Sequence, residues 1–333
     1  MPIAIRSFAK INLGLKIGPL RADGFHELRT IYQTLALHDI IWVDVQPGAG
    51  IEIHCNDPRV PLDQSNTCYK IAERVLSSVE ARRKVIIQID KRLPVQGGLG
   101  AASSNAIATM LGLERALGTE LPDREKLRIA AEVGSDLPLF LVGGTVLGVG
   151  RGEQVHPLRA LATMHLVVVT PSVGVSTPVA FARWDELVAR EAELTGAGAA
   201  GTINEFGWGV FARLSETVFS QAASASEPAS GVPAVGGDRA ETLLLDLVRA
   251  GIENDFERVV FPEYPDLREV KRVLEREGAL WASLSGSGST LYGLFESGEQ
   301  AQAAAARMTA AGHAAVATTT LTRDEYWKSV ISG

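Results

Sequence analysis

The segment Pro94-Val-Gln-Gly-Gly-Leu-Gly-Ala-Ala-Ser-Ser-Asn105 is the most informative part of this 333-residue chain. Its small residues allow several backbone N–H groups to approach an anion. Apolar residues recur at helical spacing from Ile107 to Leu113, which predicts a helix over 101–117 that ends at Gly118. Because a helix directs the positive end of its dipole at its first turn, the segment predicts a phosphate site where loop and helix meet.

Two standard nucleotide motifs are absent from this segment. It has no lysine where a GxxxxGK[ST] loop requires one, and Gly98-Leu-Gly100 is not followed by the third glycine of the dinucleotide fingerprint. A glycine-rich turn capped by Ser103 or Ser104 is an equally good interpretation of the segment by itself. The rest of the chain has to decide between these alternatives.

The N-terminal segment has the alternation of a strand. Apolar residues occupy alternate positions between Ile3 and Ile17, which places Lys10 and Asn12 together on the other face. By itself, Lys10 is typical of a solvated cation on a strand. Further strands are expected at 40–45, 51–55 and 85–89, with a helix over 69–78. The first part of the chain is therefore predicted to be mixed α/β.

The middle of the chain places an aspartate between two predicted helices. The first is expected to run from a cap at Asp123 to Val133, with Gly134 ending it. Asp136 follows at the start of a helix that Pro138 would begin, where an isolated aspartate most often serves as a cap. Strands at 145–149 and 165–170, around a turn with Gly150 and Gly152, and a helix over 179–190 are expected next.

The C-terminal half alternates helices and strands as a split βαβ fold would. The expected helices cover 240–250, 266–277 and 299–311, and the expected strands cover 281–285, 291–295 and 314–319. Ser285-Gly-Ser-Gly-Ser289 lies between two of the strands, where it is typical of a hairpin turn. We therefore predict two domains, over 1–160 and 161–333, with flexible surface insertions near 195–201 and 222–237.

The composition excludes several classes of protein. With 46% hydrophobic and 21% charged residues the chain can bury a core, and its net charge of −7 disfavours binding to nucleic acid or an anionic membrane. The two cysteines, Cys55 and Cys68, lack the CxxC spacing of a zinc site. The pattern predicts neither a signal peptide nor a membrane span, so the expected location is the cytoplasm.

Taken together, five segments resemble the GHMP kinases, the superfamily of galactokinase, homoserine kinase and mevalonate kinase. They occur in the family's order and spacing: Lys10 with Asn12, Arg21-Ala-Asp-Gly-Phe-His26, the Pro94–Asn105 loop, Gly134-Ser-Asp-Leu-Pro138 and Ser285–Ser289. Ala9-Lys-Ile-Asn-Leu13, Arg21–His26 and Asp90-Lys-Arg-Leu-Pro94 further resemble the branch that acts on 4-diphosphocytidyl-2-C-methyl-D-erythritol. The resemblance implies a two-domain α/β (α+β) fold, with a ribosomal-protein-S5-like N-terminal domain and a ferredoxin-like C-terminal domain.

The resemblance also implies an ATP site and a catalytic pair. The family's catalytic aspartate corresponds to Asp136, which would take or orient the proton of an acceptor hydroxyl group. Its lysine corresponds to Lys10, which would keep that carboxylate ionised and stabilise developing charge. Mg²⁺ would be carried with ATP, without a separate metal site on the protein. The residues that would wrap the triphosphate are Pro94, Gly97, Gly98, Leu99, Gly100, Ala101, Ala102, Ser103 and Ser104, and Gly286, Ser287 and Gly288 would form a further phosphate-binding or closing loop.

The cytidine end of the acceptor is implied to lie near Phe25, His26 and Phe181. In the family aromatic rings sandwich the base and the histidine binds its edge, whereas His26 by itself is typical of a polar residue at a strand end. Asn12 and Thr177 would help to hold the acceptor. Phe25 stands where tyrosine is expected, which keeps a stacking face and loses a hydroxyl group. Ala101 and Ala102 stand where the family more often has glycine, so two added methyl groups must fit.

Two alternatives remain open at this point. The same chemistry could act on another small alcohol, of the homoserine or mevalonate type, without a cytidine pocket. A catalytically silent nucleotide-binding protein of the same fold would also carry the loop, although the presence of Lys10 and Asp136 argues against it. The expected partner is a small molecule, with no nucleic acid and no membrane, and the expected assembly is a monomer or a weak homodimer.

Overall fold

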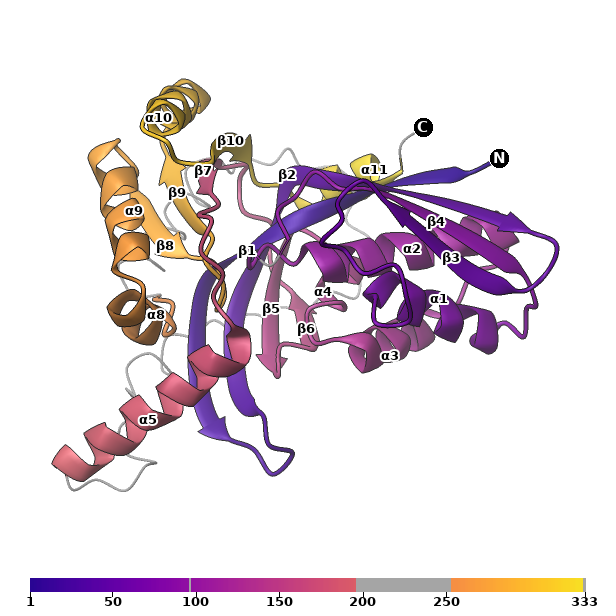
Figure 1. The fold of residues 1–333 in the computed structure, drawn as a ribbon, viewed down its shortest axis with the longest axis horizontal. Coiled ribbons are helices and arrows are strands. Elements are labelled where there is room, and N and C mark those ends of the chain that lie inside the picture. The colour runs from indigo at the N-terminus through magenta and orange to yellow at the C-terminus, as the bar shows by residue number, and fades with distance from the viewer. Residues whose placement is uncertain (96, 196–252, 332–333) are drawn as a thin grey trace, which may run out of the picture.

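A computed structural model of the chain describes residues 1–95, 97–195 and 253–331. In these residues the strands form two sheets, each with helices on one side (Figure 1). The helix predicted at 240–250 and the insertion predicted at 222–237 lie outside the described residues. The insertion predicted near 195–201 also lies outside them, except for Thr195, the last residue of a helix.

The first sheet has six strands within the described residues, in the order β3-β4-β2-β5-β6, with β1 paired to β2. β3 and β4 are parallel, and the other pairs are antiparallel. The bounds are β1 Ile3–Leu20, β2 His26–Gln46, β3 Gly50–Cys55, β4 Lys84–Asp90, β5 Thr145–Gly150 and β6 Gln154–Pro157. The strands predicted at 51–55, 85–89 and 145–149 are confirmed, whereas β6 was not predicted.

Strand β2 is much longer than its sequence suggests, because it begins at His26 and not at residue 40. Its first half buries the polar side chains of Thr30, Gln33 and Thr34, all of which make hydrogen bonds. Buried polar residues interrupt the apolar alternation by which a strand is found. Together β1 and β2 form a long hairpin within the first sheet that also passes beside the second sheet (Figure 1).

Helices α1 to α4 lie on one side of the first sheet (Figure 1). Their bounds are α1 Thr67–Ser78, α2 Ala101–Leu117, α3 Asp123–Val133 and α4 Leu139–Val142. The prediction of α2 is confirmed at both ends, and that of α3 is confirmed at its C-terminal end. The predicted cap of α3 is wrong by one residue, because Pro122 is the N-cap and Asp123 is the first helical residue. Its carboxylate still lies near the positive end of the helix, where it is favourable.

The second sheet has the antiparallel order β10-β7-β9-β8 in the described part of the chain. Its strands are β7 His165–Val169, β8 Trp281–Leu284, β9 Leu291–Phe295 and β10 Ala315–Thr319. The helices of this half are α5 Thr177–Thr195, α8 Glu257–Glu263, α9 Pro265–Arg276 and α10 Gly298–Ala310. This is the strand order of a split βαβ unit, so the predicted ferredoxin-like architecture is confirmed.

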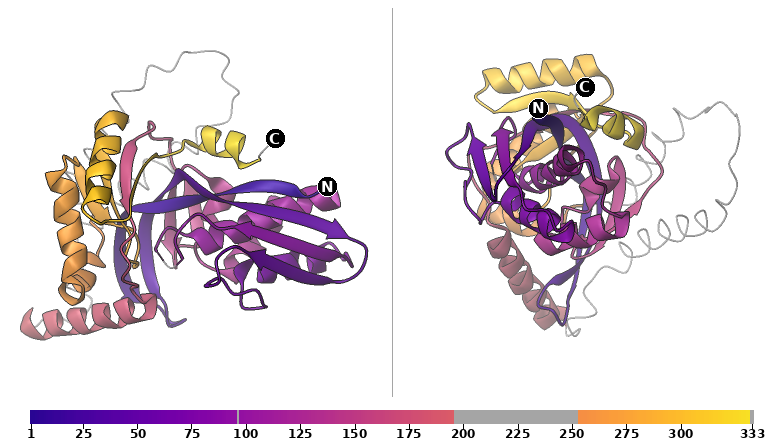
Figure 2. Two further views of the ribbon diagram at one scale, coloured as in Figure 1. Left: turned by 45° about the horizontal axis from the view of Figure 1, so that its top comes forward. Right: turned by 90° about the vertical axis from the view of Figure 1, so that its right-hand side faces the viewer.

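The C-terminal helix α11 (Arg323–Val330) returns to the first half of the molecule. Tyr326 and Val330 belong to the core of that half, and the Tyr326 hydroxyl group donates to the Phe140 carbonyl oxygen over 2.7 Å. The chain ends are therefore close together (Figure 2). A domain boundary at residue 160 stays a prediction, but the core of the first half includes residues from both sides of it.

Candidate active site

A cavity of about 910 Å³ lies between the β1–β2 hairpin, the glycine loop and helix α5. Residues that are far apart in the sequence line it together. Of the predicted site residues, those that line it are Lys10, Asn12, Phe25, His26, Pro94, Gly97, Gly98, Leu99, Gly100, Ala101, Ala102, Ser103, Asp136, Thr177, Phe181, Gly286 and Ser287. Ser104 and Gly288 do not line it.

The ammonium group of Lys10 meets the carboxylate of Asp136 inside this cavity. Lys10 Nζ lies 3.3 Å from Asp136 Oδ2, and the two side chains are 4% and 34% exposed. Lys10 is not the solvated cation that an isolated strand lysine most often is, because the glycine loop covers it and its amide donates to the Leu99 carbonyl oxygen. Asp136 is not a helix cap, since the N-cap of α4 is Pro138. Its carboxylate lines the cavity beside Lys10.

Asn12 holds Lys10 in place on the same strand. Lys10 Nζ donates to Asn12 Oδ1 over 2.8 Å, and Asn12 Nδ2 donates to Thr30 Oγ1 over 2.7 Å. Thr30 in turn donates to the Gly14 carbonyl oxygen. The pairing of β1 with β2 shifts register both between Phe8 and Lys10 and between Asn12 and Gly14. Such bulges redirect side chains beside active sites, and here they flank the two residues that face the cavity.

Tyr32 on β2 is a second partner of Asp136, and the sequence does not distinguish it from a core tyrosine. Its hydroxyl group donates to Asp136 Oδ1 over 3.0 Å, and Lys10 Nζ lies 5.4 Å from its ring centroid. Burial raises the pKa of Tyr32 well above its usual value, and the charge of Asp136 acts in the same direction. The hydroxyl group therefore remains a hydrogen-bond donor to the carboxylate.

Replacing Tyr32 with Phe should lower turnover without unfolding the protein. The ring stays buried, but one of the two groups that orient the Asp136 carboxylate is lost. A hydrogen bond to a charged group contributes about 1.5–3 kcal/mol, so kcat should fall about 10- to 100-fold. Tyr326→Phe is the matched control, because its buried hydroxyl group donates to a backbone carbonyl outside the cavity. Equal losses in both variants would contradict this role of Tyr32.

The glycine loop leads directly into helix α2, as the sequence predicts. Gly100 is the N-cap, with a φ of 68°, and no side chain caps the helix. The first N–H groups of a helix have no intrahelical acceptor, so those of α2 are available to a ligand in the cavity. Ala101 is buried and Ala102 is exposed, so both added methyl groups are accommodated.

Ser104 is directed away from the cavity. Ser7 Oγ donates to Ser104 Oγ over 2.8 Å, and the Ser104 amide donates to the Gly100 carbonyl oxygen. Successive residues of a helix point in different directions, and only Ser103 of the two serines lines the cavity. Neither serine caps the helix as the alternative interpretation of the loop required. The structure therefore gives Ser103, and not Ser104, access to a ligand.

The loop over 285–289 joins β8 to β9 as a hairpin turn and also packs against the glycine loop. Ser285 Oγ donates to the Gly98 carbonyl oxygen over 3.2 Å, and the Thr290 amide donates to the Gly97 carbonyl oxygen over 3.1 Å. Gly98 has a φ of 85°, and a β-carbon there would collide with the Ser285 carbonyl oxygen. The two loops therefore form one continuous wall of the cavity.

Asn254 positions this second loop, although the sequence does not single it out. Its buried Nδ2 donates to the carbonyl oxygens of Leu284 and Gly286, over 2.8 Å each. The next residue, Asp255, accepts a hydrogen bond from the Ile17 amide over 2.8 Å. Two adjacent side chains thus join the second loop to strand β1, which carries Lys10.

The residues predicted to bind cytidine lie together in the cavity. His26 stacks on Phe181, with ring centroids 5.3 Å apart and planes at 8°. Phe25 is 52% exposed, and Arg151 Cζ lies 5.0 Å from its ring centroid. A base held between the aromatic rings of Phe25 and Phe181, with His26 at its edge, stays a prediction.

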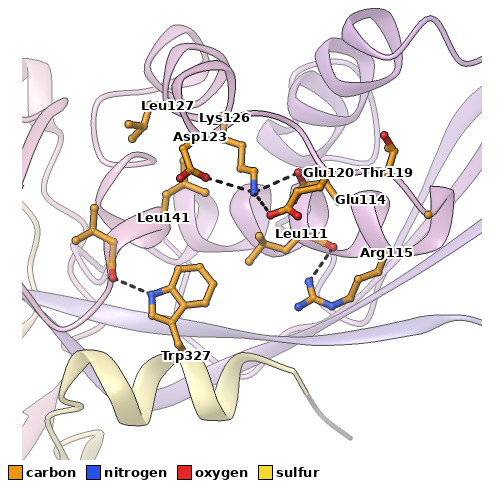
Figure 3. Close-up of a pocket in the computed structure, with 12 residues that line it drawn as sticks. Leu111, Glu114, Arg115, Thr119, Glu120, Asp123, Lys126, Leu127, Leu141 and Trp327 are labelled. Carbon is orange, nitrogen blue, oxygen red and sulfur yellow. Dashed lines mark hydrogen bonds and ion pairs between the residues drawn. The ribbon is translucent and has the colours of Figure 1, made fainter. Parts of the chain in front are cut away.

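A second hollow, of about 820 Å³, lies between α2, α3 and α11 (Figure 3). Lys126 Nζ is 3.4 Å from Glu114 Oε1 and 3.3 Å from Glu120 Oε1. Trp327 Nε1 donates to the Val142 carbonyl oxygen over 3.0 Å. Because these polar groups pair with one another, they give no sign of a ligand.

Comparison with known proteins identifies the fold family. Two family models match the chain, one described as GHMP kinases N terminal domain over residues 66–144 and one as GHMP kinases C terminal over residues 240–314. The solved homoserine kinase of Cytophaga hutchinsonii is 19% identical, with a TM-score of 0.63 over 96% of this chain and 95% of its own. The L. major mevalonate kinase is 16% identical, with a TM-score of 0.63 over 96% of both chains. At these identities the likeness shows the fold alone.

Relatives named 4-diphosphocytidyl-2-C-methyl-D-erythritol kinase match over nearly the whole chain. That of Acaryochloris marina is 33% identical and the match covers 91% of this chain and 90% of the relative. That of Geobacter sulfurreducens is 32% identical and the match covers 96% and 99%. A crystal structure of 4-(cytidine 5'-diphospho)-2C-methyl-D-erythritol kinase is 27% identical, with a TM-score of 0.68 over 96% of this chain and 99% of that chain. The chain therefore belongs to the 4-diphosphocytidyl-2-C-methyl-D-erythritol kinase family of the GHMP kinases.

Proposed function

We propose that this protein transfers the γ-phosphoryl group of ATP to the 2-hydroxyl group of 4-diphosphocytidyl-2-C-methyl-D-erythritol, a step of the non-mevalonate route to isoprenoid precursors. The observation that carries the proposal is the Lys10–Asp136 pair, 3.3 Å apart in one cavity with the N-terminus of α2. Phosphoryl transfer to an alcohol needs a group that accepts the hydroxyl proton and fixed donors that stabilise the phosphates. Membership of the family supplies the identity of the acceptor.

Backbone groups hold the phosphates in this proposal. N–H groups between Gly98 and Ser103 replace water around the transferring group with dipoles that are already fixed, which reduces the cost of reorganisation in the transition state. The positive end of α2 adds to their effect. The loop therefore needs no lysine of its own. Gly286 and Ser287 of the second loop face the same space and would close it.

Asp136 accepts the proton of the acceptor hydroxyl group as the hydroxyl oxygen attacks the γ-phosphorus. The new O–P bond forms while the bond between the γ-phosphorus and the β–γ bridging oxygen breaks, and ADP leaves with that oxygen. Lys10 stabilises the negative charge that develops on the phosphate oxygens. Tyr32 and Asn12 keep the two charged groups aligned, so positioning supplies much of the rate.

Mg²⁺ enters this proposal together with ATP. Proteins bind Mg²⁺ through substrate phosphates and a few protein oxygens, and the Asp136 carboxylate and the Ser103 hydroxyl group are oxygens of that kind in the cavity. When bound, the ion neutralises charge on the β- and γ-phosphates. Within residues 1–95, 97–195 and 253–331, no cluster of three or more His, Cys, Asp or Glu side chains could hold a metal by itself.

Arg151 provides a cation between the two ends of the cavity. Its guanidinium group lies beside the Phe25 ring, and a β-carbon on the next residue, Gly152, would lie 2.5 Å from the Tyr32 hydroxyl group that binds Asp136. A diphosphate that links a base near Phe25 to an alcohol near Asp136 would pass Arg151. Because guanidinium groups bind phosphates through paired hydrogen bonds, we assign Arg151 to the diphosphate of the acceptor.

The proposed reaction requires small molecules only. Among the described helices, none combines the length and the apolar character that crossing a membrane requires. We propose a cytoplasmic enzyme that acts as a monomer or a weak homodimer and binds no nucleic acid. The net charge of −7 supports the last of these statements.

A panel of acceptor alcohols tests the proposed function. With ATP and Mg²⁺, the purified protein should release ADP in the presence of 4-diphosphocytidyl-2-C-methyl-D-erythritol and not in the presence of homoserine or mevalonate. Phosphorus NMR of the product should place the new phosphate on the 2-hydroxyl group. Turnover of homoserine or mevalonate would assign another acceptor. If none of the three compounds leads to ADP release, the result would indicate a silent nucleotide-binding protein.

A further inference from the structure

The edge of strand β1 that faces away from β2 is closed by three other parts of the chain. Among the described strands, β1 forms a ladder with β2 only, so its other edge needs partners from elsewhere. The Lys10 amide donates to the Leu99 carbonyl oxygen of the glycine loop, and the Leu15 amide donates to the Glu253 carbonyl oxygen. The third partner meets β1 between these two points, and it is a side chain.

Tyr292 on strand β9 is this third partner. Its hydroxyl proton is shared by the carbonyl oxygens of Asn12, at 3.1 Å, and Leu13, at 3.4 Å. The side chain is fully buried and belongs to the same apolar cluster as Leu13 and Leu99. Burial raises the pKa of the Tyr292 hydroxyl group above its ordinary value, so the group keeps its proton and remains a donor.

The two carbonyl groups belong to a bulge in β1. The register with β2 shifts by one residue between Asn12 and Gly14, so Leu13 is the extra residue of this strand. A bulge leaves its extra residue outside the ladder, and buried backbone groups of this kind need another partner. The Tyr292 hydroxyl group supplies one, and it therefore fixes the backbone where β1 changes register.

The Asn12 side chain leads from this backbone to the ammonium group of Lys10. Asn12 Oδ1 accepts from Lys10 Nζ over 2.8 Å, and Asn12 Nδ2 donates to Thr30 Oγ1. Lys10 Nζ in turn lies 3.3 Å from the Asp136 carboxylate. A change in the backbone of Asn12 would move its amide group and, with it, the ammonium group beside Asp136. Misplacement by about 1 Å that originates far from the reacting atoms can cost about 100-fold in rate.

We infer that Tyr292 is a positioning residue for phosphoryl transfer, because its hydroxyl group fixes the bulge of β1 and, through Asn12, the position of Lys10 beside Asp136. The inference rests on the proposed function and adds to it a residue outside the cavity. Tyr292 follows the loop over 285–289 on β9. It therefore also ties the second sheet to the strand that carries Lys10.

Tyr292→Phe keeps the buried ring and removes only the hydroxyl group. With ATP, Mg²⁺ and the acceptor, kcat per folded protein should fall about 10-fold, an effect of the size of one hydrogen bond. The KM for ATP should not change, because the Tyr292 hydroxyl group contacts β1 and not the glycine loop. A loss confined to kcat is the result expected of a group that aligns the reacting residues and does not bind the nucleotide.

Tyr326→Phe is the matched control for the loss of a buried hydroxyl group. Tyr326 also donates to a backbone carbonyl oxygen, that of Phe140, but it lies in the core of the first half. Both variants should be less stable to urea than the wild type, and kcat should fall only in Tyr292→Phe. An equal fall of kcat in both variants, or no fall in Tyr292→Phe, would overturn the inference.

A double variant tests whether Tyr292 acts through Asn12. Asn12→Ala removes the amide group that holds Lys10 and should lower kcat by itself. If Tyr292 acts through that amide group, adding Tyr292→Phe to Asn12→Ala should lower kcat no further, because residues that act as a unit give non-additive losses. Losses that multiply would assign Tyr292 a general structural role and would also overturn the inference.

Hydrogen exchange separates this inference from the proposed function. Mass spectrometry of the protein without substrates should show faster amide exchange over residues 10–15 in Tyr292→Phe than in the wild type, and no such change there in Tyr326→Phe. If the wild-type protein phosphorylates no acceptor, the proposed function fails while exchange still tests whether Tyr292 fixes the bulge. If exchange over 10–15 is unchanged in Tyr292→Phe, the inference fails while turnover stands.

Discussion

Asp136→Asn is expected to lose about 10²- to 10⁴-fold in kcat, the range for removal of a general base. The amide cannot accept the proton of the acceptor hydroxyl group at neutral pH. Its oxygen can still accept hydrogen bonds from the two partners of the carboxylate, Lys10 and Tyr32, so the fold should be retained. ATP binding should also be retained, because the N–H groups of the glycine loop do not depend on Asp136.

Three measurements test this prediction. Steady-state ADP release gives kcat, isothermal titration with ATP gives the nucleotide affinity, and circular dichroism reports the fold. Asp44→Asn removes a carboxylate from strand β2 outside the cavity and should change none of them. Turnover near the wild-type level in Asp136→Asn would remove Asp136 from the mechanism. Loss of ATP affinity together with turnover would assign it a role in binding.

The meeting of Lys10 with Asp136 could be predicted from the family's motifs but not from local physical chemistry. Each residue by itself favours an ordinary role, as a solvated cation and as a helix cap. The structure shows neither of these roles. The glycine loop covers Lys10, and the carboxylate of Asp136 contacts Tyr32 and Lys10 in the cavity. These are long-range contacts, and their spacing in the sequence has meaning only once related proteins are known.

Elements with local signals were predicted most accurately. Helix α2 has a glycine before its first turn and another after its last, and both ends match the structure. Strand β2 shows the opposite case, because its first half is buried between β1 and β5 and uses polar residues such as Gln33 inside the sheet. Apolar and polar residues do not alternate there, so the sequence predicts the strand only from residue 40 onward.

Residues whose roles come from distant contacts were not found from the sequence. Tyr32 and Asp136 are 104 residues apart, and Asn254 is 30 residues from the first carbonyl group that it holds. In each case the informative observation is a partner in space, and no periodicity or cap indicates it.

The buried ion pair of Asp39 and Lys91 is the second place where a large effect is expected. Asp39 is fully buried, and its Oδ2 lies 2.7 Å from Lys91 Nζ. Its Oδ1 accepts hydrogen bonds from the amides of Arg92 and Leu93, over 2.7 Å each. These residues directly precede Pro94, so one buried carboxylate fixes the backbone where the glycine loop starts.

Asp39→Asn should lower the free energy of unfolding by about 3–5 kcal/mol, because removing one partner leaves the other charge buried and unpaired. The new amide group also cannot accept as strongly from two backbone N–H groups at once. Urea denaturation followed by circular dichroism measures the loss. The double variant Asp39→Asn/Lys91→Met, which lacks both charges, should recover part of it.

Asp90→Asn is the control that separates burial from charge. Asp90 lies on the neighbouring strand β4 and pairs with Arg92 over 2.8 Å, but the two side chains are 35% and 49% exposed. Water already screens this pair, so its loss should change the free energy of unfolding by less than about 1 kcal/mol. Because Asp39, unlike Asp90, accepts from the Arg92 and Leu93 amides before the glycine loop, Asp39→Asn should also raise the KM for ATP in the protein that remains folded. An unchanged free energy of unfolding in Asp39→Asn would show that the buried pair contributes no net stability, and an unchanged KM would show that the loop keeps its shape without it.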